Sequence, residues 1–180
     1  MKKLSAILFF LFPVIIFSQD PHFTQYYSSS LQLNPSLAGS LGYSRLVLAY
    51  RHQWPAISGG FKTANISHDR FVKSIKGGIG LNFMHDIAGE GILKTTRIGI
   101  IYSPAFIIRE KISIKLSLET TIFQKTIDWS KLTFGDMIDP QYGFIHNTKE
   151  VPPSSDKSGI DFSTGVLMNG IKCNTGLAIH

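Results

Sequence analysis

The chain has 180 residues, which is enough for one domain of ordinary size. Hydrophobic residues make up 43% of it, which excludes an intrinsically disordered chain, and charged residues make up 17%, which is low for a water-soluble domain. Lysine and arginine together number 18 against 12 acidic residues. Because this excess is mild and contains no basic run, the sequence argues against a nucleic-acid-binding protein.

The N-terminus carries the pattern of a secretory signal peptide over residues 1–18. Two lysines precede an apolar stretch over residues 4–17, and Ser18 is a small residue at the expected cleavage point. Residues 19–42 are expected to be irregular, since prolines and a serine run interrupt any long regular element. No later apolar stretch approaches the roughly 18 residues of a transmembrane helix.

Alternating patterns then predict four β-strands, over residues 44–51, 61–69, 77–86 and 92–102. In the first, third and fourth of these, large apolar side chains occupy alternate positions, with polar, charged or small residues between most of them. This period of two is typical of a strand whose two faces meet different surroundings. The second strand is predicted without an assignment of its faces.

The clearest alternation in the chain lies within residues 111–127. Its even positions carry Ile112, Ile114, Leu116, Leu118 and Ile122, and its odd positions carry Lys111, Ser113, Lys115, Ser117 and Glu119. A long strand that is apolar on one face and charged on the other is the unit of a transmembrane β-barrel. The sequence therefore predicts an all-β fold, an antiparallel barrel of the outer-membrane type over residues 43–180.

Residues 160–179 predict a β-hairpin centred on Asn169-Gly170. Asn-Gly supplies the positive φ angles that a two-residue type I′ turn requires. In this register Val166 faces Cys173, so Cys173 is expected on the apolar face as a small hydrophobic residue. As the one cysteine of the chain, it cannot form an intrachain disulfide.

Seven strands joined as a meander place their connections alternately at two ends of the sheet. Connections 71–76, 103–110 and 169–170 lie at one end, and 52–59, 87–91 and 128–158 lie at the other. Outer-membrane barrels have short periplasmic turns and longer outer loops, so residues 128–158 are expected outside the cell. Because bacterial barrels use an even number of strands, about eight or more, we expect an incomplete barrel whose further strands lie beyond His180.

Two more sets of side chains fit a barrel. Charged residues of the polar faces are expected to line the interior: Arg45, Arg51, Arg97, Lys115 and Glu119. Aromatic residues near strand ends are expected in the girdles at the membrane–water interfaces: Tyr50, Tyr102 and Trp129.

No catalytic, cofactor-binding or metal site is expected. The six histidines lack metal-ligand spacing, and Gly77–Gly80 lacks the lysine and helix of a phosphate-binding loop. A hydrolase at the barrel rim could use His68-Asp69 or His85-Asp86 with a nearby serine. Adjacent residues of a strand point to opposite faces, however, and cannot form one dyad.

Several blocks of the sequence resemble the PorP/SprF family. They occur in the family's order and extend over nearly all of the chain after the signal peptide. The blocks are QDPHFTQY at 19–26, NPSLAG at 34–39, YRHQW at 50–54, GGIG at 77–80 with His85-Asp86 and Gly89, and Gly135-Asp136 through Asp139.

This resemblance implies an outer-membrane β-barrel of the type IX secretion system in Bacteroidetes. It implies a non-enzymatic protein that assists secretion or surface attachment of large adhesins, including those of gliding motility. The implied partners are the C-terminal domain of the cargo, other components of the secretion system and outer-membrane lipid. Contacts with the partner are expected on the outer loops, including Arg51, Gln53 and Trp54.

Three alternatives remain open from the residues alone. A general porin or small-solute channel fits the charged inner face equally well. An enzyme at the barrel rim is the second alternative, and a soluble secreted β-sandwich, which the long strands disfavour, is the third.

The predicted orientation can be tested with protease. Protease added to intact cells should cleave within residues 128–158, because this long connection is expected on the outer surface. The short connection at 71–76 should be cut only after lysis and serves as the control. Cleavage of 128–158 in lysed cells alone would reverse the orientation.

Overall fold

The computed structural model describes residues 28–57, 59–109, 112–139, 141, 143–145, 148–150, 154–170 and 173–180. The expected signal peptide over residues 1–18 lies outside these residues. Among the described residues, no helix has the length and apolar character needed to cross a membrane.

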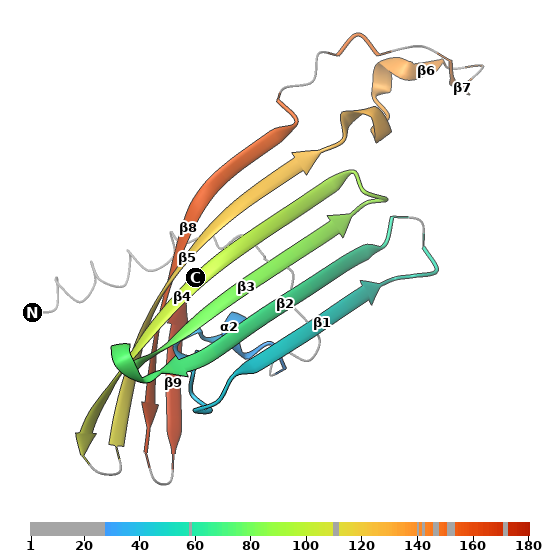
Figure 1. The fold of residues 1–180 in the computed structure, drawn as a ribbon. Coiled ribbons are helices and arrows are strands. Elements are labelled where there is room, and N and C mark those ends of the chain that lie inside the picture. Colours follow the sequence, from blue (N-terminus) through green and yellow to red (C-terminus); the bar gives the residue numbers. More distant parts are fainter. Residues whose placement is uncertain are drawn as a thin grey trace, which may run out of the picture.

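In the described part of the chain, seven strands form one antiparallel sheet that curls into a half-barrel (Figure 1). Each strand pairs with the next one along the chain, and β1 and β9 form the two edges. The fold predicted from the sequence, an all-β, incomplete barrel of about seven strands, is confirmed. The strands are β1 (Arg45–Gln53), β2 (Phe61–Val72), β3 (Gly77–Ala88), β4 (Leu93–Arg109), β5 (Ile112–Ile127), β8 (Asp156–Asn169) and β9 (Asn174–Ile179).

The connections alternate between the two ends of the sheet, as the meander requires (Figure 1). The connection between β2 and β3 contains the short helix η4 (Lys73–Ile75). The long connection between β5 and β8 contains several short elements. These are η5 (Trp129–Lys131), η6 (Gly135–Met137) and the paired strands β6 (Ile138–Asp139) and β7 (Gly143–Phe144).

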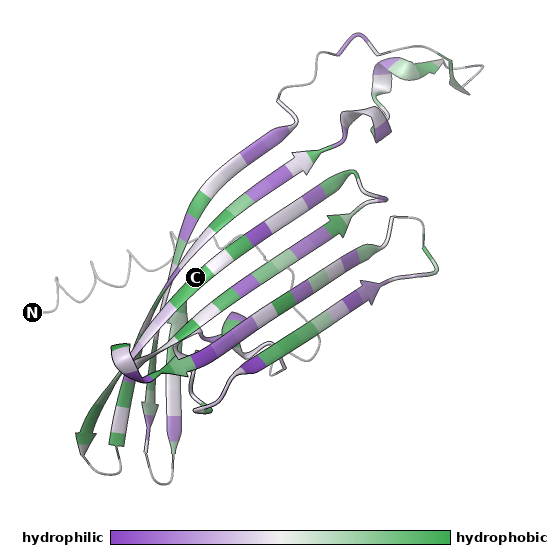
Figure 2. Ribbon diagram, viewed as in Figure 1, coloured by the Kyte–Doolittle hydropathy of each residue, from purple (hydrophilic) through white to green (hydrophobic). Residues whose placement is uncertain are grey.

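The convex face of the sheet is apolar. One register row crosses six strands and consists wholly of exposed apolar side chains: Leu48, Ile66, Phe83, Ile98, Ile122 and Ile160. Figure 2 shows the alternation of hydrophobic and hydrophilic residues along the strands. A continuous exposed apolar surface of this kind is unusual for a soluble monomer and typical of the outward band of a membrane barrel.

The concave face is polar and largely buried. In β2 it carries Thr63, Asn65, Ser67 and Asp69, so the faces of this strand, which the sequence left open, are now assigned. The convex side of β2 mixes apolar and polar residues, which explains why its periodicity was weak. The face assignments predicted for β1, β3, β4 and β5 are confirmed.

Strand β4 continues through the region where residues 103–110 were expected to turn. Its pairing with β5 is interrupted at Ser103 and Pro104 and resumes in the same register at Ala105, opposite Lys115. Proline lacks an N–H group and removes one hydrogen bond of the ladder. The prediction of a turn was wrong because the strand is paired on both sides of this gap.

The hairpin between β8 and β9 has a longer loop than predicted. Val166 pairs with Leu177 instead of Cys173, a shift of four residues, and the Gly170 N–H donates to the Cys173 carbonyl at 3.0 Å. Because the shift is even, the strands keep their predicted faces. Cys173 itself lies exposed in the loop and not on the apolar face.

The predicted girdle residues divide into two groups. Tyr50 and Tyr102 are exposed on the convex face, and the Tyr102 hydroxyl donates to the Ile75 carbonyl at 3.3 Å. Trp129 is not on a strand but in η5, where its indole N–H is buried and has no hydrogen-bond partner among the described residues. It follows the end of β5 by two residues, which agrees with the expected place near a strand end, and its role in the girdle stays a prediction.

Replacing Leu118 by arginine should destabilise the protein in membranes by about 2–4 kcal/mol, because Leu118 belongs to the apolar series on the convex face of β5. Gln124→Arg on the same face, near the end of the same strand, should change stability by only about 0–1 kcal/mol. Urea unfolding in lipid vesicles measures both values. Equal effects at the two positions would contradict a lipid-facing convex surface.

Candidate functional site in the polar concave face

Residues 28–42 lie against the concave face of the sheet, and we call them the inner segment (Figure 1). The segment contains α2 (Ser30–Leu33) and η3 (Pro35–Leu37). Helix η3 contacts β3, β4, β5 and β8. Leu31, Ser36 and Ala38 are almost completely buried, so the inner segment occupies the concavity instead of lying across its surface.

The turn that starts η3 is built by Asn34. Its side-chain oxygen accepts from the Ser36 N–H at 2.9 Å, which caps the short helix, and Pro35 follows at the first helical position. The same side chain donates through Nδ2 to the carbonyls of Val166 and Leu177, each at 3.3 Å. One asparagine therefore shapes the inner segment and ties it to β8 and β9.

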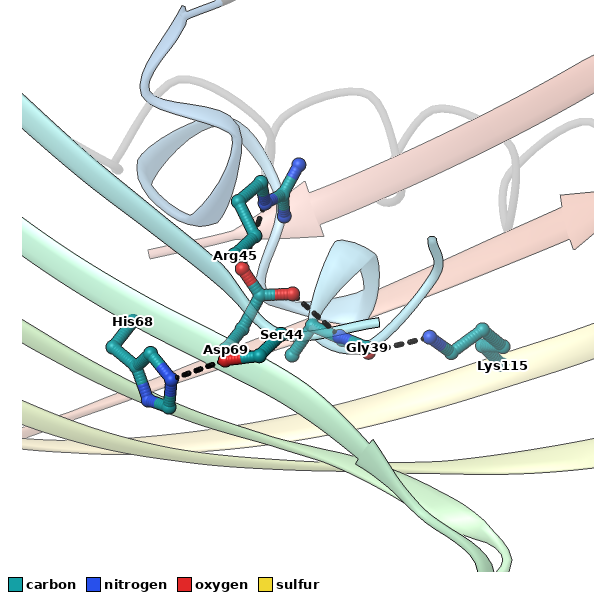
Figure 3. Close-up of polar contacts among 7 residues, drawn as sticks. Gly39, Ser44, Arg45, His68, Asp69 and Lys115 are labelled. Atoms are coloured by element: carbon teal, nitrogen blue, oxygen red, sulfur yellow. Dashed lines mark hydrogen bonds and ion pairs between the residues drawn. The ribbon is translucent and has the colours of Figure 1, made fainter. Parts of the chain in front are cut away.

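The peptide unit between Ala38 and Gly39 is held from two sides by charged residues (Figure 3). Lys115 Nζ on β5 donates to the Ala38 carbonyl at 2.5 Å, and the Gly39 N–H donates to Asp69 Oδ2 on β2 at 2.7 Å. We call these two residues the Asp69–Lys115 clamp. Hydrogen bonds to ionised partners are about twice as strong as neutral ones, so the clamp is the firmest polar attachment of the inner segment.

Asp69 is only 1% exposed and needs compensation for its buried charge. Arg45 supplies it, since Arg45 Nε lies 2.8 Å from Asp69 Oδ1. The two carboxylate oxygens thus have different partners, the guanidinium of Arg45 and the backbone of Gly39 (Figure 3). Loss of Asp69 would remove this partner from the partly buried Arg45 and release the inner segment at the same time.

Two glycines allow the inner segment to approach β3 closely. A Cβ atom on Gly78 would overlap the Ala38 carbonyl oxygen, and a Cβ on Gly39 would lie 2.7 Å from the Gly78 Cα. Gly39 also has a φ of +64°, in the left-handed region that favours glycine. The glycine of NPSLAG and the second glycine of GGIG are therefore parts of one contact.

Further charges of the concave face form a second polar cluster. Arg97 Nη2 lies 3.2 Å from Asp161 Oδ2, and Glu119, which is 6% exposed, accepts from the Thr121 hydroxyl at 3.4 Å. Gly99 leaves the space that the Glu119 carboxylate occupies. The expectation that Arg45, Arg97, Lys115 and Glu119 face inward agrees with these positions.

The structure brings two of the three predicted partner-binding residues together. Arg51 Nη2 donates to Gln53 Oε1 at 2.6 Å, and both side chains lie on the half-buried face of β1. Trp54 follows the strand, is 55% exposed and has a φ of +55°. Its ring packs against Phe61 in a T-shaped arrangement, with centroids 5.7 Å apart and an interplanar angle of 67°.

A catalytic dyad from His68 and Asp69 is not formed. Asp69 points into the concavity, whereas His68 lies on the opposite face (Figure 3). His68 Nε2 instead forms a hydrogen bond with Ser44 Oγ at 2.7 Å, a pair that the sequence did not predict, and no carboxylate of the described residues joins it. The described residues also contain no group of three potential metal ligands.

The connection between β5 and β8 is tied together by one carboxylate. Asp136 accepts from the Lys149 N–H at 2.8 Å and from the Thr148 hydroxyl at 3.0 Å. The backbone hydrogen bond from Lys149, helped by the hydroxyl of Thr148, lowers the pKa of Asp136 below its ordinary value. This attachment joins Thr148 and Lys149 to η6 within the predicted outer loop.

Comparison with known proteins supports the resemblance seen in the motifs. A family model described as the type IX secretion system membrane protein PorP/SprF matches residues 15–180. This chain belongs to the PorP/SprF family. No curated protein and no solved structure gives a match. Membership makes this PorP/SprF chain a membrane component of the type IX secretion system, in agreement with the apolar convex face.

The contacts of the inner segment were not foreseen from the sequence. The available signal was the pair of blocks NPSLAG and GGIG, whose glycines meet, although they lie far apart in the chain. The Ser103 hydroxyl on β4 also donates to the Ser36 carbonyl, at 3.2 Å. Only the folded sheet places these residues around one segment.

Gly78→Ala should destabilise the protein by about 1–3 kcal/mol, because the added methyl group overlaps the backbone of the inner segment. The matched control is Gly80→Ala on the same face of β3, where the nearest atoms to a Cβ are side chains at 3.3 Å. Urea midpoints of the two variants in detergent give the comparison. If the Gly80 variant is the less stable of the two, the close contact between Gly78 and the inner segment is contradicted.

Proposed function

We propose that this PorP/SprF protein is a non-enzymatic component of the outer membrane that assists secretion or surface attachment of a large adhesin or other cargo. In this proposal it binds the C-terminal domain of the cargo and works with other components of the type IX secretion system. The observation that carries the proposal is the match of residues 15–180 to the family model. The apolar outer face of the sheet agrees with it.

The assignment to the outer membrane is supported by the kind of sheet. Antiparallel strands with an apolar outward face and a polar inward face are the architecture of bacterial outer-membrane barrels. The sheet of this chain has an apolar convex face and a polar concave face. The connections between its strands alternate between the two ends of the sheet. Outer-membrane lipid is therefore the proposed surrounding of the convex face.

We further propose that the cargo contacts the rim formed by Arg51, Gln53 and Trp54. Tryptophan and arginine are enriched among the residues that dominate binding energies. Trp54 is more than half exposed, and its packing against Phe61 holds the ring without covering it. This combination of exposure and preorganisation favours a binding role.

A small-solute channel is the second candidate, and the charged cluster of the concave face favours it. Arg97, Asp161 and Glu119 provide the polar lining that water and solutes require. The buried inner segment argues against a permanently open channel, because it fills part of the concavity. Cargo binding is therefore the preferred function.

Trp54→Ala should weaken binding of the cargo's C-terminal domain at least about fivefold, the loss expected when a central aromatic contact is truncated. Tyr43→Ala is the control, since Tyr43 is also more than half exposed but precedes the opposite end of β1. Binding of the purified domain to the detergent-solubilised protein gives both affinities. Unchanged affinity of the Trp54 variant, combined with rapid solute flux through the unaltered protein, would favour the channel instead.

A further inference from the structure

We propose that the inner segment, residues 28–42, is a releasable plug of the barrel lumen and that the Asp69–Lys115 clamp is its latch. The inference depends on the barrel fold and not on binding of a cargo protein. It goes beyond the role of a membrane component of a secretion system, because it assigns a closed and an open state to the lumen. It also names the contacts that are made in the closed state and lost in the open one.

The plug is held mainly by polar contacts. Its buried apolar cluster contains only Leu31, Ala38 and Ile101 in the described residues. The attachments to the wall are hydrogen bonds that join Gln32, Asn34, Ser36, Ala38 and Gly39 to side chains or carbonyls of six strands. Water can replace such bonds when the segment moves out, whereas a large apolar interface would resist separation.

The latch acts on a single peptide unit. The carbonyl and the N–H of a trans peptide point in opposite directions, so one positive and one negative side chain can grip the Ala38–Gly39 unit from opposite sides. Asp69 and Lys115 come from β2 and β5, and Gly78 of β3 lies behind the peptide. The clamp recognises the backbone, so removal of the two charges removes the latch without altering the plug itself.

The closed state leaves buried polar groups without partners. Ser29 Oγ of the plug and Nη2 of Arg45, the residue that pairs with Asp69, are both buried and make no hydrogen bond within the described part of the chain. An unpartnered buried polar group lowers the stability of the state that contains it. Release of the plug would let water reach both atoms, which reduces the free-energy difference between the closed and the open state.

A glycine in open surroundings connects the plug to the sheet. Gly42 has a φ of +77°, and no atom of the described residues lies within 4 Å of the position that its Cβ would occupy. The neighbouring residues Leu41, Tyr43 and Ser44 are exposed, and β1 starts at Arg45. The chain can therefore turn at Gly42 while β1 stays in the sheet.

Accessibility of a thiol in the plug tests the inference. Ser36 is fully buried, so a thiol introduced by Ser36→Cys should resist a bulky maleimide reagent in isolated outer-membrane fragments that are open to the reagent on both sides. The native Cys173, which is exposed in its loop, should react readily and serves as an internal control in every sample. The protein is produced from its full gene, and the modified forms are counted by gel mobility.

Asp69→Asn combined with Lys115→Met should raise the labelling rate of the introduced thiol by about tenfold or more, because two charge-assisted hydrogen bonds to the plug are lost. The matched control is Asp156→Asn with Lys125→Met, which removes the same two charges at exposed positions of β8 and β5. This pair should leave the rate unchanged. Heat-modifiable migration in gels shows that each barrel is still folded.

Two results would overturn the inference. Labelling of the introduced thiol as fast as that of Cys173 in the otherwise unaltered protein would show that the segment does not plug the lumen. Equal protection in the clamp variant and in its control, with both barrels folded, would show that Asp69 and Lys115 are not the latch. Neither result depends on cargo binding, so failure of this inference is distinguishable from failure of the proposed function.

Discussion

Hydrocarbon offers no hydrogen-bond partner to a polypeptide backbone, and this constraint governs the whole fold. Each strand must satisfy its N–H and C=O groups through its neighbours, which requires an extended antiparallel sheet. The side chains then alternate between lipid and interior, so the usual distribution of a soluble protein is inverted. Ile66 and Phe83 are exposed on the convex face, whereas Asn65, Asp69 and Ser103 are almost fully buried on the concave face.

The inner segment completes this inverted arrangement. A polar concave face needs partners for its charges, and the backbone of residues 34–39 provides some of them. Glycines at 39 and 78 make the approach possible, and a cap by Asn34 fixes the turn that presents the peptide groups. The candidate site is therefore a polar contact between the concave face of the sheet and the inner segment. It is not a pocket of reactive side chains.

Much of the sheet could be predicted from the sequence because alternation is a local signal. The faces of β5 followed directly from residues such as Leu118 and Glu119, whereas β2 could not be assigned because His68 and Arg70 interrupt its apolar side. Pro104 and Asn169-Gly170 usually indicate turns. In the folded sheet, however, pairing with β5 extends β4 past Pro104, and pairing of β8 with β9 gives a longer loop than a two-residue turn at Asn169-Gly170. The Asp69–Lys115 clamp could not be foreseen, because its members meet Ala38 and Gly39 only after β2 and β5 curve around them.

The bridge made by Asn34 has a consequence for assembly. Its side chain bonds to carbonyls that lie 132 and 143 positions further along the chain. Such distant partners do not exist until β8 and β9 have paired, and contacts of long sequence separation form slowly. A region synthesised early thus reaches its final position late, so the attachment of Asn34 shows that β9 has joined the sheet.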